Sequence, residues 1–218
     1  MIQETSYKVD KRIVKEIALF DAETKHSLNQ PTGDFFYDPW LIKPEYKGTV
    51  FEELLNTLPD PHGEARLITL KSGTCYFSHS DIDDRYHLNI SGDLAGLINL
   101  ETKQCWFLKN DGVWYSMDAS PLHSAMNFGQ HDRKQIVVRK LLTKNKLKNP
   151  YLIKILPSGK NPRFVFDNII SPWLNRANKD KIIDNFKTDG TTVSFKIEKS
   201  HIENFKKILP ENFICNIE

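Results

Sequence analysis

The stretch from Arg66 to Arg139 constrains the fold most, because its apolar residues alternate with polar ones in short runs instead of recurring at helical spacing. Turn-forming residues separate the runs, as at Ser91-Gly92-Asp93 and Asn110-Asp111-Gly112. The expected strands cover residues 66–70, 75–81, 85–90, 94–100, 105–108, 113–117 and 133–141. Several short strands at this spacing predict a mainly β fold of the sandwich or barrel type.

Two histidines and one aspartate in this stretch are candidate metal ligands. His79 and Asp81 are two residues apart, so they are expected on one face of the predicted strand at 75–81. His123 follows the turn at 118–121. Two imidazoles and one carboxylate occupy one face of an octahedral ion and leave positions for other ligands, unlike a closed structural zinc site. The sequence therefore predicts an open metal site of the non-haem iron type, for which a jelly-roll (double-stranded β-helix, cupin-like) core is the usual fold.

An arginine and a polar strand face accompany these ligands. Arg133 begins the predicted strand at 133–141, and a permanently charged guanidinium that faces the interior needs a carboxylate partner. A dicarboxylate ligand would supply one. Arg85, His87 and Asn89 alternate on another predicted strand. They could contact the second carboxylate of that ligand or orient the metal ligands.

These motifs resemble the aspartyl/asparaginyl β-hydroxylase family, including its bacterial free-proline hydroxylase branch. The family consists of iron(II)- and 2-oxoglutarate-dependent dioxygenases on a double-stranded β-helix. The resemblance covers roughly residues 66–142. It rests on His79-x-Asp81, Arg85-Tyr86-His87-Leu88, Trp114-Tyr115-x-Met117-Asp118-Ala119-Ser120-x-x-His123-Ser124-Ala125 and Arg133-x-x-x-Val137-Val138.

The resemblance implies an enzyme that uses iron(II), 2-oxoglutarate and O2 to hydroxylate an amino acid, either free or within a peptide or protein. By this resemblance, iron would be held by three residues, His79, Asp81 and His123. Arg133 would bind the distal carboxylate of 2-oxoglutarate. The co-substrate would lie along Arg85 and His87.

Two departures from the family pattern leave the substrate open. Animal members that hydroxylate protein domains lack the carboxylate ligand that Asp81 would supply here, so the chain looks closer to the bacterial hydroxylases. The sequence from Thr143 onward matches nothing in the family. One alternative is a non-catalytic cupin-like module that holds a purely structural metal and docks an acidic partner through its basic C-terminal region. Another is an oxygenase that acts on a small metabolite other than an amino acid.

The region from 133 to 163 is strongly basic and contains no Asp or Glu. Such a run favours a solvated face and a linker. The alternative is a docking surface for an acidic macromolecular partner, such as nucleic acid or a ribonucleoprotein.

The composition predicts a globular chain of 218 residues with 39% hydrophobic and 27% charged residues. We expect a domain at 1–142 with N-terminal flanking elements, and a small basic α+β unit at 143–218. No apolar run is long enough to cross a bilayer and no secretory signal opens the chain, so we expect no membrane contact and a cytoplasmic location. The oligomeric state stays open.

Helices are expected outside the alternating stretch. Thr49 and Glu52 form a capping box before an apolar face that ends at Pro59. In the C-terminal unit, Ser171-Pro172 is typical of a helix start, and residues 179–186 have helical spacing. A strand is expected at 191–197, and a second capping box at Ser200 is expected to open the last helix.

Overall fold

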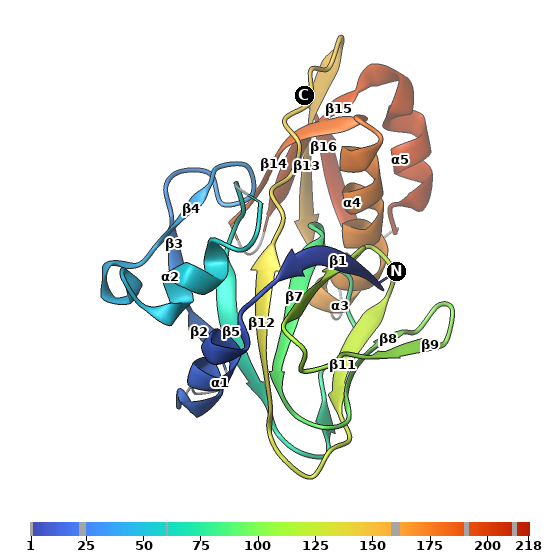
Figure 1. Cartoon of the computed structure of the whole chain (residues 1–218). Coiled ribbons are helices and arrows are strands. Elements are labelled where there is room, and N and C mark those ends of the chain that lie inside the picture. The colour runs from blue at the N-terminus through green and yellow to red at the C-terminus, as the bar shows by residue number, and fades with distance from the viewer. Residues whose placement is uncertain (1, 22–24, 60, 158–161, 190–191, 211–212) are drawn as a thin grey trace. The chain divides into compact units, whose positions relative to one another are not determined.

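The computed structural model describes residues 2–21, 25–59, 61–157, 162–189, 192–210 and 213–218. Contacts along the chain group it into two compact units. The first unit comprises Met1–Ser78 and Asp83–Leu141, and the second comprises Leu142–Glu218 together with the short segment His79–Ile82. Figure 1 shows the elements of both units.

The first unit is mainly β, and its paired strands are antiparallel. Its larger sheet has the order β1-β10-β7-β12-β5-β2 and its smaller sheet the order β6-β11-β8-β9. The larger sheet is made of β1 (Ile2–Lys8), β2 (Lys25–Ser27), β5 (Ala65–Leu70), β7 (Arg85–Ser91), β10 (Val113–Met117) and β12 (Arg133–Arg139). The smaller sheet is made of β6 (Thr74–Cys75), β8 (Ala95–Asn99), β9 (Gln104–Phe107) and β11 (His123–Asn127). A separate pair is formed by β3 (Asn29–Pro31) and β4 (Trp40–Ile42).

The two faces of β7 and β12 have different chemistry. On one face, Leu88, Ile136 and Val138 are buried in an apolar cluster with residues of the helices described below. The other face is polar and equally buried, and it carries Arg85, His87, Asn89, Arg133 and Gln135. Arg133 donates to backbone carbonyls of β8 and β11, so this polar face looks toward the smaller sheet. The alternation predicted for these two strands is confirmed.

Two helices cover the apolar face of the larger sheet, as Figure 1 shows. They are α1 (Lys11–Leu19) and α2 (Val50–Leu55), with a 3-10 turn, η1 (Pro44–Tyr46), before α2. Asp10 caps α1 by accepting from the Arg12 N–H, and Thr49 caps α2 by accepting from the Phe51 N–H. The predicted cap at Thr49 is therefore confirmed, although Glu52 accepts from the Gly48 N–H instead of completing the box.

The second unit has a four-stranded antiparallel sheet with the order β14-β15-β13-β16. Its strands are β13 (Pro150–Pro157), β14 (Ile183–Thr188), β15 (Val193–Glu198) and β16 (Phe213–Ile217). Its helical elements are α3 (Pro162–Val165), the π-turn η2 (Phe166–Ile170), α4 (Ser171–Lys179), the 3-10 turn η3 (Lys199–His201) and α5 (Ile202–Ile208). Phe205 of α5 packs between Trp173 of α4 and Phe195 of β15, with ring centroids 4.7 and 5.3 Å away.

The helix predicted at 179–186 is wrong, because α4 ends at Lys179 and β14 follows it. The register of β14 against β15 shifts between Asp184 and Lys187, and Asn185 in this bulge has a positive φ of 53°. A bulge adds one residue to the strand, so Ile183 and Phe186 both point into the core although they are three residues apart. Buried residues three positions apart are also expected on one face of a helix, which explains why the sequence predicted a helix here.

The other helix starts in this unit also differ from expectation. Ser171 begins α4, as predicted, but it does not cap it, because the N-cap position is Ile170 and helical structure already precedes it from Pro162. The N-cap position of α5 is His201, which is the last residue of η3, and Ser200 also lies within that turn. The strand predicted at 191–197 is confirmed as β15, except that Thr191 lies outside the described residues. No helix in the described part of the chain is long and apolar enough to cross a membrane.

Candidate metal centre

His79 and Asp81 lie in the connection between β6 and β7, because β6 ends at Cys75 and β7 begins at Arg85. The strand predicted at 75–81 is therefore wrong over most of its length. Strand alternation does not bring the two side chains together, but they are close nonetheless. His79 Nε2 lies 3.8 Å from Asp81 Oδ2, and the two side chains are 35% and 21% exposed.

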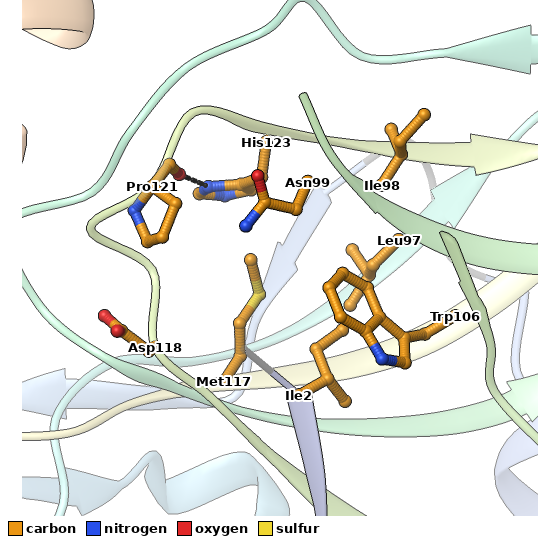
Figure 2. A pocket seen from close by; sticks show the side chains of 9 residues that line it. All are labelled: Ile2, Leu97, Ile98, Asn99, Trp106, Met117, Asp118, Pro121 and His123. Carbon is orange, nitrogen blue, oxygen red and sulfur yellow. Dashed lines mark hydrogen bonds between the residues drawn. The ribbon is translucent and has the colours of Figure 1, made fainter. Parts of the chain in front are cut away.

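His123 opens β11, a strand that the sequence pattern did not reveal. Its side chain is buried, and its Nδ1 lies 2.9 Å from the Pro121 carbonyl oxygen, as Figure 2 shows. A ring nitrogen that faces a carbonyl donates its proton to it, so the tautomer with a free lone pair on Nε2 is favoured. This is the arrangement that a metal-binding histidine needs.

The three predicted ligands are brought together. His79, Asp81 and His123 each offer a ligand atom, and these atoms all lie within 4.8 Å of one another. Two imidazole nitrogens and one carboxylate oxygen suit a divalent first-row transition metal, and three ligands leave coordination positions for small molecules. The group could hold a metal ion, and its use as a metal site stays a prediction.

Arg133 is a fully buried cation. Its Nε donates to Asn89 Oδ1 at 3.2 Å and its Nη1 to the Gly96 carbonyl at 3.0 Å. Its Nη2 has no hydrogen-bond partner, and no carboxylate forms an ion pair with it, among the residues that the structure describes. Burial lowers the pKa of Arg133 to about 10, a shift that nearby Tyr76 opposes. The side chain therefore stays charged at neutral pH.

His87 is a second buried group with unused polar atoms. Both ring nitrogens are buried without a hydrogen-bond partner among the described residues. Burial, together with the charges of Arg133, Arg85 and His123, lowers the pKa of His87 to about 3. Gln135 beside the ring opposes the shift, although no hydrogen bond of ordinary geometry joins the two side chains. The imidazole is therefore neutral near pH 7.

Arg85 is paired within the protein. Its Nε and Nη2 both lie 2.7 Å from Asp83 Oδ1, and Arg139 Nη1 lies 2.8 Å from Asp83 Oδ2. The Arg139 Nε in turn lies 3.2 Å from Glu64 Oε2. Asp83 is 2% exposed, so these two arginines hold its charge in the interior. Contact between Arg85 and a co-substrate stays a prediction.

A small pocket opens beside His123 in the first unit (Figure 2). Its empty volume is about 210 Å³, which includes space open to solvent. The lining is mostly apolar and consists of Ile2, Leu97, Ile98, Asn99, Trp106, Met117, Asp118, Pro121 and His123. Sequence reasoning missed Ile2, because the strand β1 that carries it lies far from the motifs in sequence.

Several side chains of the basic region are engaged inside the first unit. Besides Arg133 and Arg139, Lys134 donates to the carbonyls of Ala18 and Phe20, both at 2.7 Å. Lys140 lies over the Tyr86 ring, 4.3 Å from its centroid. An acidic partner for residues 133–163 stays a prediction.

Comparison with known proteins gives little further support. No protein-family model matches the sequence, and no curated protein matches it. Among solved structures, CapF in complex with the inhibitor 3-isopropenyl-tropolone aligns with 52% of this chain at 14% identity and a TM-score of 0.32. The aligned part spans 31% of the CapF chain. A likeness this low carries no argument about fold or activity, so the hydroxylase resemblance rests on the motifs alone.

Proposed function

We propose that the protein is an iron(II)- and 2-oxoglutarate-dependent dioxygenase that hydroxylates an amino acid, either free or within a peptide or protein. The observation that carries the proposal is Arg133, a buried guanidinium with no carboxylate partner among the described residues. An uncompensated buried charge is strongly unfavourable. A carboxylate ligand that enters the protein would compensate it.

The strand order supports a jelly-roll core. Strands β5 to β12 fall into two sets of four, β10-β7-β12-β5 and β6-β11-β8-β9. Most consecutive strands in this series belong to opposite sheets, as expected when a chain winds through two facing sheets in Greek-key fashion. In such a core, His123 lies on β11 and Arg133 on β12. These two strands are consecutive in the sequence and belong to the two facing sheets.

The donor set supports a metal in this core. His79, Asp81 and His123 would hold iron(II), with the proton on His123 Nδ1 held by the Pro121 carbonyl so that Nε2 faces the ion. When bound, iron would supply the oxygen activation that no amino-acid side chain provides. The chain itself contributes position and exclusion of water.

Arg133 would recognise the co-substrate. Asn89 and the Gly96 carbonyl fix the plane of the guanidinium through Nε and Nη1 and leave Nη2 for a carboxylate of 2-oxoglutarate. Neutral His87 nearby can donate to an oxygen of the same ligand without adding charge. In the overall reaction, 2-oxoglutarate, O2 and a substrate C–H bond give succinate, carbon dioxide and a C–OH group. One oxygen atom of O2 enters succinate and the other enters the hydroxyl.

The pocket beside His123 would receive the substrate. Its lining by Leu97, Trp106 and Met117 suits an apolar part of a small side chain. The carbon to be hydroxylated would then lie on the metal side of the pocket, next to His123.

The deciding experiment combines spectroscopy with product analysis. Anaerobic addition of iron(II) and 2-oxoglutarate should give a weak visible charge-transfer band, which His79→Ala should abolish. With air and a panel of amino acids and peptides, succinate should form at a rate that depends on the substrate. Absence of the band with intact protein would sink the proposal. Succinate release driven only by other metabolites would move the substrate outside the amino acids.

Arg133 can be tested separately with a truncated ligand. Wild-type protein should bind 2-oxoglutarate more tightly than 2-oxobutyrate, which lacks the distal carboxylate. Arg133→Met should lose most of this preference and keep iron(II) binding. Equal discrimination by the wild type and the variant would contradict the assigned role of Arg133.

A further inference from the structure

We infer that the helical segment from η2 into α4 holds the loop that carries His79 and Asp81 in the geometry needed for metal binding, with Asn175 as the main positioning residue. The inference rests on the proposed function, because it assigns a role around the same ligands. It concerns the second unit, which includes both the segment His79–Ile82 and α4. Apart from the segment His79–Ile82, this unit lies outside the hydroxylase resemblance, which covers roughly residues 66–142.

The π-turn η2 provides an acceptor for the loop. In an α-helix the Asp167 carbonyl would accept from the Ser171 N–H, but here that N–H bonds to the Phe166 carbonyl. The residue five positions after Asp167 is Pro172, which has no N–H. The Asp167 carbonyl instead accepts from the Ser80 N–H at 3.0 Å. Single π-turns inside helices are frequent at functional sites, and this one turns a helix carbonyl toward a loop.

Two side chains of α4 hold the next peptide groups. Ser171 Oγ donates to the Ser80 carbonyl at 3.3 Å, and Asn175 Nδ2 donates to the Asp81 carbonyl at 3.1 Å. Ser171 and Asn175 are four residues apart and share one face of the helix. Their exposures of 2% and 1% mean that water does not compete for these bonds.

Together these bonds fix three successive peptide groups. They hold the N–H of Ser80, the carbonyl of Ser80 and the carbonyl of Asp81. Fixing these groups sets the backbone dihedral angles at Ser80 and Asp81, and therefore the direction in which the Asp81 carboxylate points. The loop needs such support because sheet pairing at β6 ends with Cys75.

Positioning of this kind has a measurable consequence. Groups that orient metal ligands typically change metal affinity about 10- to 100-fold when they are removed. Removal of the Asn175 amide should therefore weaken metal binding, because it removes the bond that Asn175 donates to the Asp81 carbonyl.

Asn178 provides a matched control. It lies on the same helix and is 3% exposed, and its side chain is also hydrogen-bonded to a backbone segment. However, its Nδ2 donates to the Thr143 carbonyl and its Oδ1 accepts from the Thr143 N–H, at 3.0 and 3.1 Å, so it holds a different part of the chain. Both variants lose a buried amide, but only Asn175→Ala removes a bond to the ligand loop.

The test titrates the full-length protein with cobalt(II) alone and follows the visible absorption of the bound ion. We expect Asn175→Ala to weaken cobalt binding by about tenfold or more and to change the band shape. Asn178→Ala should match the wild type in both. Equal effects of the two substitutions would overturn the inference and leave the proposed function intact.

A milder pair of variants covers the case in which Asn175→Ala does not fold. Ser171→Ala should weaken cobalt binding, and Ser171→Thr, which keeps the hydroxyl, should restore it. Unchanged affinity in Ser171→Ala and a folded Asn175→Ala would overturn the inference. If the wild type binds cobalt and Asn175→Ala weakens that binding, the positioning role stands even if 2-oxoglutarate has no effect. A wild type that binds no cobalt overturns both proposals.

Discussion

At the scale of single residues, two buried polar side chains have atoms without a hydrogen-bond partner among the described residues. Arg133 is charged and fully buried, with part of its guanidinium unbonded among the described residues. His87 lies close enough to have its pKa lowered by the Arg133 charge, and neither of its ring nitrogens is bonded there. Such groups usually lower the stability of the folded state. This loss of stability is explained if Arg133 and His87 bind an anionic ligand between the sheets.

Replacement of Arg133 should separate stability from ligand binding. Without ligand, we expect Arg133→Met to leave the free energy of unfolding unchanged or higher, because an uncompensated buried charge is removed. Saturating 2-oxoglutarate with a metal should stabilise the wild type by about 2.7 kcal/mol at 100 times its Kd, and the variant far less. Urea denaturation with and without the ligand checks this. A large loss of stability in the unliganded variant would instead indicate a purely structural arginine.

His87 should make stability depend on pH. Its pKa is lowered to about 3 in the folded protein from an ordinary value near 6.5, so between these limits the unfolded chain binds a proton that the folded chain does not. The stability of the folded state is therefore lost as pH falls below 6.5, by up to about 1.4 kcal/mol per pH unit. We expect His87→Gln to flatten this slope in urea denaturation between pH 4 and 6.5. Parallel slopes for the two proteins would show that other groups cause the dependence.

At the scale of elements, alternation predicted the long paired strands well. Strands β7, β10 and β12 lie at the predicted residues. Each has one face against the helices or the sheet core and the other against a different layer, and this difference between the faces produces the alternation in the sequence. Short or irregular elements escaped prediction. His79 and Asp81 were predicted to lie on one face of a strand. They lie instead in a loop that is held by hydrogen bonds from η2 and α4. These contacts come from residues far away in the chain, so local sequence does not predict them.

The bulge in β14 predicts which side chains the protein tolerates at position 185. Its φ of 53° lies in the left-handed region, which asparagine tolerates and β-branched residues avoid. We expect Asn185→Val to lower the free energy of unfolding by about 1–2 kcal/mol, whereas Asn185→Gly should have little effect. Chemical denaturation of both variants provides the measurement. Similar stabilities for Asn185→Val and the wild type would mean that the strand can adopt another register.

At the scale of the whole molecule, composition and periodicity predicted a mainly β chain with a few covering helices, and the structure has antiparallel sheets of that kind. The membership of each sheet was not visible in the sequence, because β6 is only two residues long and β11 was not predicted. The charged interior was also underestimated. Hydrophobic patterns identify apolar cores, whereas the inner faces of β5, β7 and β12 are joined by ion pairs that link Glu64, Arg66, Asp83, Arg85 and Arg139.

Asp83 is the centre of that buried network, and its charge should be essential for the stability of the first unit. It is 2% exposed and pairs with Arg85 and Arg139, so Asp83→Asn leaves two guanidinium groups short of negative charge. Breaking a buried ion pair from one side typically costs about 3–5 kcal/mol, and we expect a loss of this size in urea denaturation. Asp132→Asn is the matched control, because Asp132 pairs with Lys71 at the surface, where screening by water leaves little net stabilisation. Comparable small losses in both variants would mean that water reaches the network. The interior between the sheets would then be polar enough to solvate a charge. In that case the unpaired charge of Arg133 would no longer be a strong argument for a bound carboxylate.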